Sequence, residues 1–319
     1  MKIIRPIAAL LPLLILFQSG CAVMPRDSNV DLIVRYAPSG FWQQVHIGAK
    51  AAASPHGVQI SYMGPEMDST EQIEILAQSI QREPDAMMLV AADYEIMAEP
   101  MERVIEAGID VVLIDSVINS DKWVALVSSD NSGIGAELAF ELTGLVDRPG
   151  SVGVISFIQD AFPFTEREES FLAALSGYGS LAVLDTVYCN RSVEVAEQLA
   201  EDMIMATPDL VAIAGLNGVC LIGAARAIEG MDREDIVLVG VDLGLEGVHF
   251  MEQGILDVAI VQNPYLMGYY AFQTVMRHLA GEQVDRYIYT ETRVIHPGNL
   301  FDIENQQLIF PFLSPVSGR

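Results

Sequence analysis

Residues 30–62 read VDLIVRYAPSGFWQQVHIGAKAAASPHGVQISY. In this stretch a β-rich apolar run, 30–36, leads through a turn into a segment of helical period, 41–53, and then into a second apolar run, 58–62. Strands that are almost wholly apolar are typical of a parallel sheet that is buried on both faces and covered by crossover helices. The stretch therefore predicts an α/β fold.

The same alternation continues along the rest of the chain. Further strands are predicted at 86–91, 111–114, 123–128, 151–156, 181–188, 210–214, 236–241, 258–261 and 287–295. Helices are predicted at 69–81, 95–107 and 264–280, and others begin near Ser132, Thr165, Ser192, Asn217 and Leu245. The apolar residues of 299–310 are expected to pack on the body of the protein.

Two stretches resemble joints between two such sheets. In 127–133 an apolar run gives way to polar residues before a helix whose expected cap is Asn131 or Ser132. In 261–264 a proline follows a strand and opens the next helix, at a position where its missing N–H is not needed. The chain is therefore expected to pass between lobes more than once.

Composition excludes some classes of protein. The chain carries 43 acidic against 17 basic residues, which argues against nucleic-acid binding because phosphate contacts need clustered cations. With 51% apolar residues in 319, it has enough material for a large core, as one large domain or two lobes. The five histidines show no metal-ligand spacing, and neither a metal nor a cofactor is predicted.

The first 21 residues are typical of an export signal. Lys2 and Arg5 precede an apolar run, 6–17, that is short for a membrane span and ends in Gln18-Ser19-Gly20-Cys21. This ending resembles the bacterial lipobox, although Gln18 stands where leucine is usual. The interpretation is a signal peptide, 1–20, with lipid attached to Cys21; the alternative is an ordinary signal peptide with an incidental cysteine.

Candidate ligand-binding residues follow the predicted strands, because ligands of open α/β sheets bind beyond the carboxyl ends of the strands. Amides and carboxylates exchange hydrogen bonds with hydroxyl groups, arginine offers a planar fork of donors, and aromatic faces stack on C–H surfaces. These residues are Ser39, Phe41, Trp42, Asp93, Asp115, Asp130, Arg167, Asn217, Asp242 and Gln262.

Several of these residues also have a purely structural interpretation. Arg167 lies among Glu166, Glu168 and Glu169 and fits a surface residue that balances their charge. Asn217 and Asp242 fit helix caps, and Asp93 and Asp130 fit turns. Adjacent aromatic residues at a helix start are usually core packing.

The order of several short motifs resembles the ribose- and galactose-type periplasmic binding proteins of sugar ABC transporters. The motifs are Gly40-Phe41-Trp42, Ile114-Asp115, Ser129-Asp130-Asn131, the segment 166–171, Leu216-Asn217, the segment 239–242 and Gln262-Asn263-Pro264, and the similarity covers 30–295. The resemblance implies two Rossmann-like lobes with parallel sheets, joined by three crossovers, that close on a monosaccharide or related polyol. It implies an aromatic pair at Phe41 and Trp42, with the polar candidates on hydroxyl groups.

The resemblance sets expectations for organisation and role. The first lobe would comprise 30–130 and 263–290, the second 131–262 and 291–310, with a tether at 21–29 and a tail at 311–319. The expected protein is a monomeric, non-enzymatic solute-binding lipoprotein outside the cytoplasm, which delivers its ligand to an ABC permease. The alternative is a sensing subunit that presents the bound state to a membrane histidine kinase or chemoreceptor, and the sequence does not choose between them.

Departures from the family pattern bear on the ligand. Ribose-type members often follow the fourth-strand aspartate with arginine, whereas Ser116 follows Asp115 here, and Ala91 stands where relatives carry a polar residue. Arg191 falls near a position where relatives present an aromatic side chain. In the site it would favour an acidic or highly hydroxylated ligand; alternatively it is a solvated residue beside a cap at Ser192.

Other classes find little support. No glycine-rich dinucleotide turn follows the first strand, and no nucleophile elbow or phosphate loop is present. Repressors that share such lobes carry a DNA-binding segment where this chain has its signal segment. Beyond Cys21 the cysteines are Cys189 and Cys220, which permit one bridge, but pairing depends on geometry that sequence does not supply.

Overall fold

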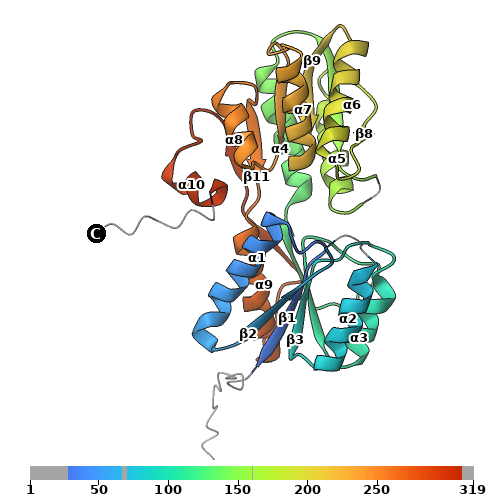
Figure 1. Cartoon of the computed structure of the whole chain (residues 1–319), viewed down its shortest axis with the longest axis vertical. Coiled ribbons are helices and arrows are strands. Elements are labelled where there is room, and N and C mark those ends of the chain that lie inside the picture. The colour runs from blue at the N-terminus through green and yellow to red at the C-terminus, as the bar shows by residue number, and fades with distance from the viewer. Residues whose placement is uncertain (1–27, 67–69, 160, 311–319) are drawn as a thin grey trace, which may run out of the picture.

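The computed structural model describes residues 28–66, 70–159 and 161–310. They form two lobes stacked along the long axis of the molecule, each a sheet with helices on both faces (Figure 1). The predicted α/β class is confirmed. The expected signal peptide 1–20, the lipid-bearing Cys21, residues 22–27 of the tether and the tail 311–319 lie outside the described residues.

The first lobe is built on a six-stranded sheet in the order β12-β5-β4-β3-β1-β2, with every strand pair parallel. The strands are β1 (Asn29–Ile33), β2 (Gln59–Met63), β3 (Ala86–Leu89), β4 (Asp110–Ile114), β5 (Ala125–Ser129) and β12 (Tyr287–Thr290). Helices α1 (Gly40–Ala53) and α9 (Pro264–Leu279) cover one face, and α2 (Glu71–Arg82) and α3 (Ala98–Glu106) cover the other (Figure 1).

Alternation along each strand explains why both faces need helices. Leu32 and Met88 pack in the apolar cluster under α1 and α9, whereas their neighbours Ile33 and Met87 pack in the cluster under α2 and α3. Successive side chains of a strand point to opposite faces, so a continuous apolar run buries a sheet on both sides. All four residues of β3 are buried as a result.

The second lobe has a seven-stranded sheet in the order β13-β11-β10-β9-β6-β7, with β8 also paired to β6 and only β13 antiparallel among its described strands. The strands are β6 (Gly150–Ser156), β7 (Leu181–Val183), β8 (Val187–Tyr188), β9 (Leu210–Gly215), β10 (Val237–Val241), β11 (Val258–Val261) and β13 (Arg293–Ile295). Helices α4 (Asn131–Leu145) and α5 (Phe164–Leu175) cover one face. Helices α6 (Val193–Ala206), α7 (Gly218–Gly230) and α8 (Leu245–Glu252) cover the other.

The end of the described chain packs on the second lobe. Helix α10 (Ile303–Ile309) follows a turn, and Leu300 and Ile309 are buried in the apolar cluster of α6, α7 and α8. The expectation that 299–310 packs on the protein is confirmed. No helix in the described ranges is long and apolar enough to cross a membrane.

Two strand predictions need correction. The segment 287–295 is not one strand: β12 pairs with β5 in the first sheet, and β13 pairs with β11 in the second. The segment 181–188 is divided into β7 and β8, which pair with opposite ends of β6 and are separated by a polar break at Asp185. Both segments are rich in β-branched, aliphatic and aromatic residues on each side of the break, and propensity does not report which sheet receives a strand.

Helix starts follow local capping chemistry. Helix α9 begins at Pro264, as predicted, and Asn263 accepts a hydrogen bond from the Leu266 N–H at 3.0 Å. The predicted cap of α4 is wrong by one residue, because Asp130 accepts the hydrogen bond from the Gly133 N–H and Asn131 is already helical. This shift leaves the Asn131 side chain available for a different contact.

Three connections join the lobes: β5 to α4, β11 to α9 and β12 to β13. Each leaves its first sheet at the carboxyl end of a strand: β5 and β12 run parallel to their neighbours, and β11 runs parallel to β10. The carboxyl ends of both sheets therefore face the opposite lobe. This is the edge at which open α/β sheets bind ligands.

Candidate functional site

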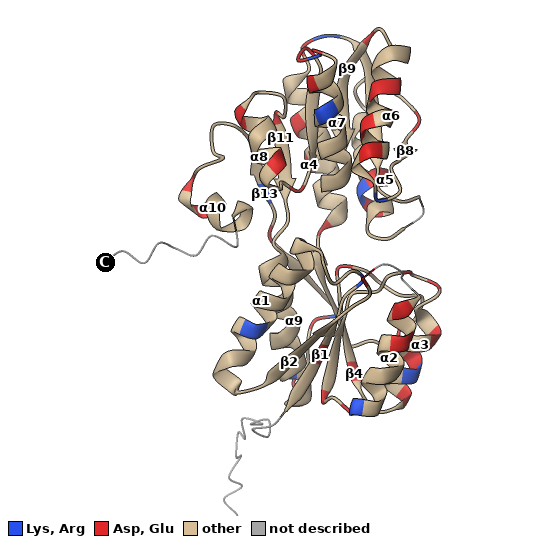
Figure 2. Ribbon diagram, viewed as in Figure 1, with Lys and Arg blue, Asp and Glu red and all other residues tan. Residues whose placement is uncertain are grey.

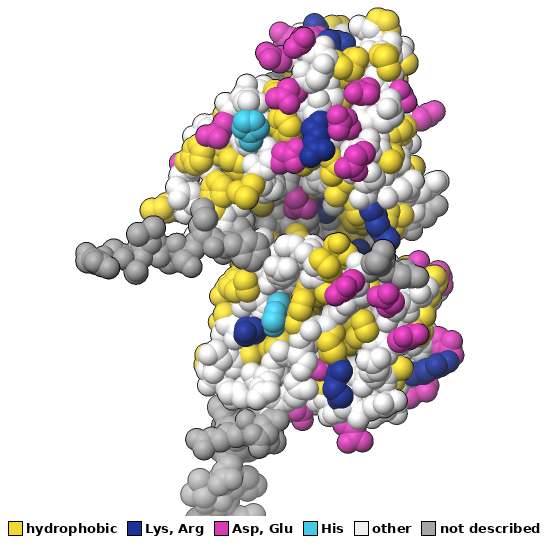
Figure 3. Space-filling model, viewed as in Figure 1, with side chains coloured by type: hydrophobic (Ala, Val, Ile, Leu, Met, Phe, Trp, Pro, Cys, Tyr) yellow, Lys and Arg dark blue, Asp and Glu magenta, His cyan; other side chains and the backbone are white. Residues whose placement is uncertain are grey.

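The surface is hollowed between the two lobes, and side chains of both charge signs are visible in the hollow (Figure 3). Over the rest of the molecule acidic residues are spread along the helices and basic residues are few (Figure 2). The net charge of the chain is −26, so the arginine side chains at the facing edges of the lobes differ in sign from most of its charged surface.

In the first lobe the site is organised by Arg35, just beyond the end of β1. Its guanidinium donates hydrogen bonds to the Asp115 carboxylate and to the Ser116 hydroxyl, and its Cζ lies 5.2 Å from the centre of the Trp42 ring. The Asp115 side chain is only 7% exposed. Burial and the positive charge of Arg191 lower the pKa of Arg35, while Asp115 opposes the shift.

Asp115 and Asp242 occupy equivalent places in the two lobes. Asp115 follows β4 with φ 66°, and Asp242 follows β10 with φ 68°, a conformation that costs a non-glycine residue about 1 kcal/mol or more. Each donates its N–H to the neighbouring strand, Asp115 to Val127 O and Asp242 to Ile260 O, both at 2.9 Å. The left-handed residue turns the chain at the sheet edge, and the pairing to the next strand fixes it there.

In the second lobe Arg167 of α5 is 1% exposed and bridges three elements. Its Nη1 donates to Leu216 O at 2.6 Å, and its Nη2 donates to Asn131 Oδ1 at 2.7 Å. Its Cζ lies 5.9 Å from the centre of the Phe164 ring. Burial lowers the pKa of Arg167, and the carboxylates of Asp242 and Asp115 oppose this.

Gln262 and Asp242 form the other polar pair of the second lobe. Gln262 Nε2 lies 3.1 Å from both Asp242 carboxylate oxygens, and the Gln262 residue is 4% exposed. Burial raises the pKa of Asp242, and the nearby charge of Asp115 adds to the rise. Asp115 of the first lobe thus acts on both Asp242 and Arg167 of the second, which places these charges within electrostatic reach across the hollow.

Several buried polar atoms at this edge have no hydrogen-bond partner among the described residues. They are Arg35 Nε and Ser129 Oγ in the first lobe and Arg167 Nε, Gln262 Oε1 and Ser156 Oγ in the second. His46 Nε2 on α1 is the remaining atom of this kind. An unsatisfied buried polar group costs about 1–3 kcal/mol, so a cluster of them at a ligand-binding edge indicates a polar ligand.

The other predicted residues make local contacts. Asp93 is exposed and accepts the N–H groups of Glu95 and Ile96, both at 2.8 Å. Asn217 accepts the Val219 N–H at 2.9 Å as the cap of α7, and Asp130 caps α4. Asn217 and Asp130 are therefore helix caps, and Asp93 stabilises a turn.

The aromatic pair and its neighbours lie at the start of α1. Trp42 is 8% exposed in the core of the first lobe, and Phe41 is half-buried with its ring centre 4.7 Å from that of Trp42, edge to face. Ser39 precedes α1 without a side-chain cap bond. Arg191 is exposed and has φ 72°, and its positive charge contributes to the lowered pKa of Arg35 in the other lobe.

Three residues of the site were absent from the predicted set: Arg35, its partner Ser116, and Asn131, which is a partner of Arg167. Arg35 lies before the turn that follows β1, whereas the predictions took residues from the turn onward. Ser116 was noted only as a departure from the family pattern. The signal available was the arginine itself, because it lies within the apolar run 30–36, two residues beyond the buried strand 29–33, where a charged side chain needs a partner.

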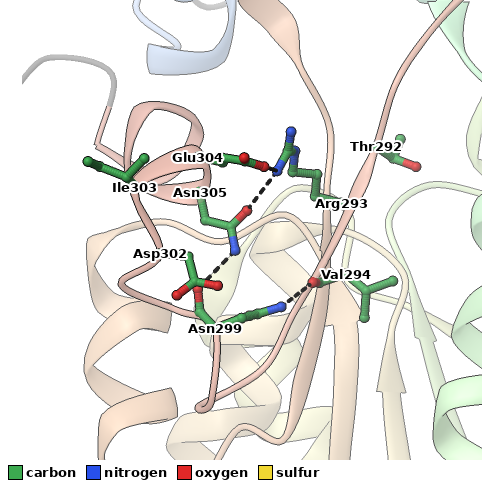
Figure 4. Close-up of a pocket in the computed structure, with 8 residues that line it drawn as sticks. All are labelled: Thr292, Arg293, Val294, Asn299, Asp302, Ile303, Glu304 and Asn305. Atoms are coloured by element: carbon green, nitrogen blue, oxygen red, sulfur yellow. Dashed lines mark hydrogen bonds and ion pairs between the residues drawn. The ribbon is translucent and has the colours of Figure 1, made fainter.

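A separate cavity of about 600 Å³ lies beside α10, away from these residues. Its lining groups largely satisfy one another: Arg293 pairs with Glu304 at 2.9 Å, and Asn305 donates to Asn299 O at 2.9 Å (Figure 4). It contains none of the buried unpartnered atoms described above. No cluster of possible metal ligands occurs within 28–66, 70–159 and 161–310.

Two lobes joined by three crossovers, with charged side chains facing each other between them, define a two-lobed solute-binding protein. The chain belongs to the periplasmic binding protein domain family, whose model matches residues 30–283. The resemblance to type I periplasmic binding proteins is thereby confirmed, as is the expectation that the protein is not an enzyme.

Similar proteins include relatives and solved structures. The D-ribose/D-allose-binding protein of Pseudomonas aeruginosa is 25% identical over 276 residues, which cover 82% of this chain and 85% of the relative. The ribose import binding protein of Escherichia coli is 21% identical, over 82% of this chain and 88% of the relative. An ABC transporter solute-binding protein of Agrobacterium vitis with bound D-fucose matches with TM-score 0.83 and 26% identity, over 89% and 100% of the chains.

A second solute-binding protein of Agrobacterium vitis, bound with α-D-tagatopyranose, matches with TM-score 0.84 and 25% identity. The match covers 89% of this chain and 99% of that one.

Proposed function

We propose that this protein captures a monosaccharide or related polyol between its lobes and delivers it to an ABC permease, as a lipid-anchored protein outside the cytoplasm. The family membership and the sugars in the two similar structures support the ligand class. In this proposal the lobes are 30–130 with 263–290 and 131–262 with 291–310, and they close on the ligand as a monomer.

The observation that carries the proposal is the set of buried, unpartnered polar atoms on both lobes. Arg35 Nε and Arg167 Nε are donors, Gln262 Oε1 is an acceptor, and Ser129 Oγ is both. A sugar hydroxyl group also donates and accepts, so neighbouring hydroxyl groups match such a mixed set. A purely apolar ligand would leave these atoms unsatisfied at a cost of about 1–3 kcal/mol each.

Each lobe also supplies a carboxylate and a guanidinium. Asp115 with Arg35, and Asp242 with Arg167, present bidentate groups that recognise adjacent hydroxyl groups. Phe41 would contact the C–H face of the sugar, with Trp42 behind it as the support for the Arg35 guanidinium. We include Arg191 as a ligand-facing residue because its charge reaches Arg35 across the hollow.

The membrane anchor in this proposal is a lipid on Cys21, and the supporting observations are the sequence of 1–21 and the extracytoplasmic location of the family. A Cys21→Ala variant is expected to leave the membrane fraction and appear in the soluble exported fraction. Retention of this variant in the membrane fraction would contradict lipid attachment at Cys21. No observation on the described residues favours the sensing role over delivery to a permease.

The test of ligand capture is a thermal-shift screen of the purified protein against pentoses, hexoses, deoxy and acidic sugars, polyols and nucleosides. A ligand that binds only the folded protein raises the melting temperature by an amount that grows with concentration, so at about 100 times Kd the gain is about 2.7 kcal/mol. A sugar hit confirmed by calorimetry supports the proposal. A well-folded protein that responds to none of these classes contradicts it.

A further inference from the structure

Two thiols outside the proposed sugar contacts lie side by side in the core of the second lobe. Cys189 Sγ and Cys220 Sγ are 3.4 Å apart, and both residues are fully buried free cysteines. They belong to the apolar cluster under α6, α7 and α8. The remaining cysteine of the chain, Cys21, lies in the N-terminal segment.

The backbone holds each cysteine at a defined place. Cys189 directly follows β8, and its N–H donates to Ser156 O at 3.0 Å, while its carbonyl accepts from the Ser192 N–H at 3.1 Å. Cys220 lies in the first turn of α7, three residues after the cap Asn217. The contact between the sulfur atoms therefore joins the loop 189–192 to the start of α7.

We propose that Cys189 and Cys220 form a disulfide in the exported protein, and that this bond fixes the loop carrying Arg191 to helix α7. A disulfide has a sulfur–sulfur distance of about 2.05 Å, so the two atoms need to approach by about 1.4 Å. No third cysteine of the described residues is near enough to compete, since these two are the free cysteines there. Compartments outside the cytoplasm allow such bonds to persist.

The oxidant in this proposal is a disulfide, either of a thiol oxidoreductase or of oxidised glutathione. The Cys189 thiolate attacks one sulfur of that disulfide, which forms a mixed disulfide and releases the first thiolate. The Cys220 thiolate then attacks Cys189 Sγ, which forms the Cys189–Cys220 bond and releases the second thiolate. Two protein thiols lose two electrons and two protons, and the oxidant gains them as two thiols.

The same products form if Cys220 attacks the oxidant first and Cys189 attacks second, because the thiolate is the nucleophile in either order. Because both sulfur atoms are buried in the folded protein, we place the reaction during folding, before α7 covers the loop.

The Cys189–Cys220 bond would restrict the conformation of the loop 189–192, which carries Arg191 of the proposed sugar site. Asn190 and Arg191 have positive φ values of 49° and 72°, so the loop holds two consecutive residues in a conformation that side chains disfavour. A covalent link at Cys189, immediately before them, limits the freedom of this loop. The bond would therefore restrict the backbone next to Arg191, whose positive charge acts on Arg35 of the other lobe.

The test uses the exported protein with Cys21→Ser, so that Cys189 and Cys220 are the only cysteines. The protein is refolded from denaturant in a mixture of reduced and oxidised glutathione, and its intact mass and its thiols are measured in denaturant. We expect a mass lower by two hydrogen atoms and no free thiol. Reduction should lower the melting temperature by about 5–10 °C, because the bond closes a loop of about 30 residues.

A Cys189→Ser, Cys220→Ser variant serves as the control and should show no change in melting temperature with reductant. Two free thiols after refolding, or glutathione attached to either cysteine in place of the internal bond, would overturn the proposal. Mass and thiol counts do not require a folded variant, so the result stands even where the serine variant folds poorly. The sugar screen is scored separately, and a negative result here leaves sugar capture unaffected.

Discussion

Replacing Arg167 with methionine should destabilise the second lobe as well as weaken binding. The side chain is 1% exposed and donates two short charge-assisted hydrogen bonds, to Leu216 O at 2.6 Å and to Asn131 Oδ1 at 2.7 Å. Each such bond contributes about 1.5–3 kcal/mol, and the replacement leaves both acceptors buried without their donor. Methionine keeps most of the side-chain volume, which confines the change to the polar contacts.

The expected net loss is about 3–5 kcal/mol of unfolding free energy, because part of the gain from these bonds already offsets the cost of burying the guanidinium. In a protein of this size that corresponds to a fall of roughly 6–20 °C in the melting temperature. The assay is thermal unfolding of the ligand-free protein, followed by circular dichroism and calorimetry.

The matched control is Arg148→Met. Arg148 is also paired, with Asp235 at 2.9 Å, but its side chain is 50% exposed, and exposed ion pairs contribute about 0–1 kcal/mol. We expect its melting temperature to stay within a few degrees of the parent protein. An Arg167→Met protein as stable as the Arg148→Met control would refute the assignment of Arg167 as the buried link between α5, Asn131 of α4 and Leu216, the residue after β9.

Three further outcomes follow from single side chains. Burial raises the pKa of Asp242, so the stability that its carboxyl group contributes is present below the unfolded pKa and is lost as pH rises. The melting temperature of Asp242→Asn should therefore rise relative to that of wild type between about pH 4 and pH 7. Burial lowers the pKa of His46, so the stability that its neutral ring contributes is present at higher pH and is lost as pH falls. The melting temperature of wild type should therefore fall relative to that of His46→Gln as pH falls from about 7.5 to 5.5. Gly268→Ala places a Cβ 1.8 Å from Val45 O between α9 and α1 and should cost about 1–3 kcal/mol in denaturant unfolding, whereas Gly144→Ala, which meets nothing within 4 Å, should not destabilise. A flat pH difference for either titrating residue, or equal stability of the two alanine variants, would contradict the corresponding argument.

The elements of the fold were predictable because their signals are local. The apolar run 86–91 indicates a strand buried on both faces, and Pro264 marks the first turn of α9 without reference to the rest of the chain. The division of 287–295 between two sheets is not visible in its residue pattern, since it depends on which lobe the chain has reached; the expected change of lobe after 290 came from the family resemblance alone. Periodicity describes a segment and not its neighbours.

The candidate site was predictable only where its signals are local. The position of Asp115 and Asp242 after buried strands indicates the ligand-binding edge, and the structure brings their charges within electrostatic reach across the hollow. The role of Arg35 was missed because its partner Asp115 is 80 residues away in sequence. Asn131 was interpreted as a cap because its contact with Arg167 is equally non-local.

The central claim is that carboxylates from both lobes hold one sugar. Calorimetric titration of wild type, Asp115→Asn and Asp242→Asn with the sugar identified by the screen tests it most directly, with the exposed Asp202→Asn on α6 as control. Loss of a hydrogen bond from a charged group costs about 1.5–3 kcal/mol, so each site variant should bind about 10 to 150 times more weakly and the control should bind as wild type does. If either Asp115→Asn or Asp242→Asn keeps the wild-type affinity, the sugar does not bridge the two lobes through these carboxylates and the account is wrong.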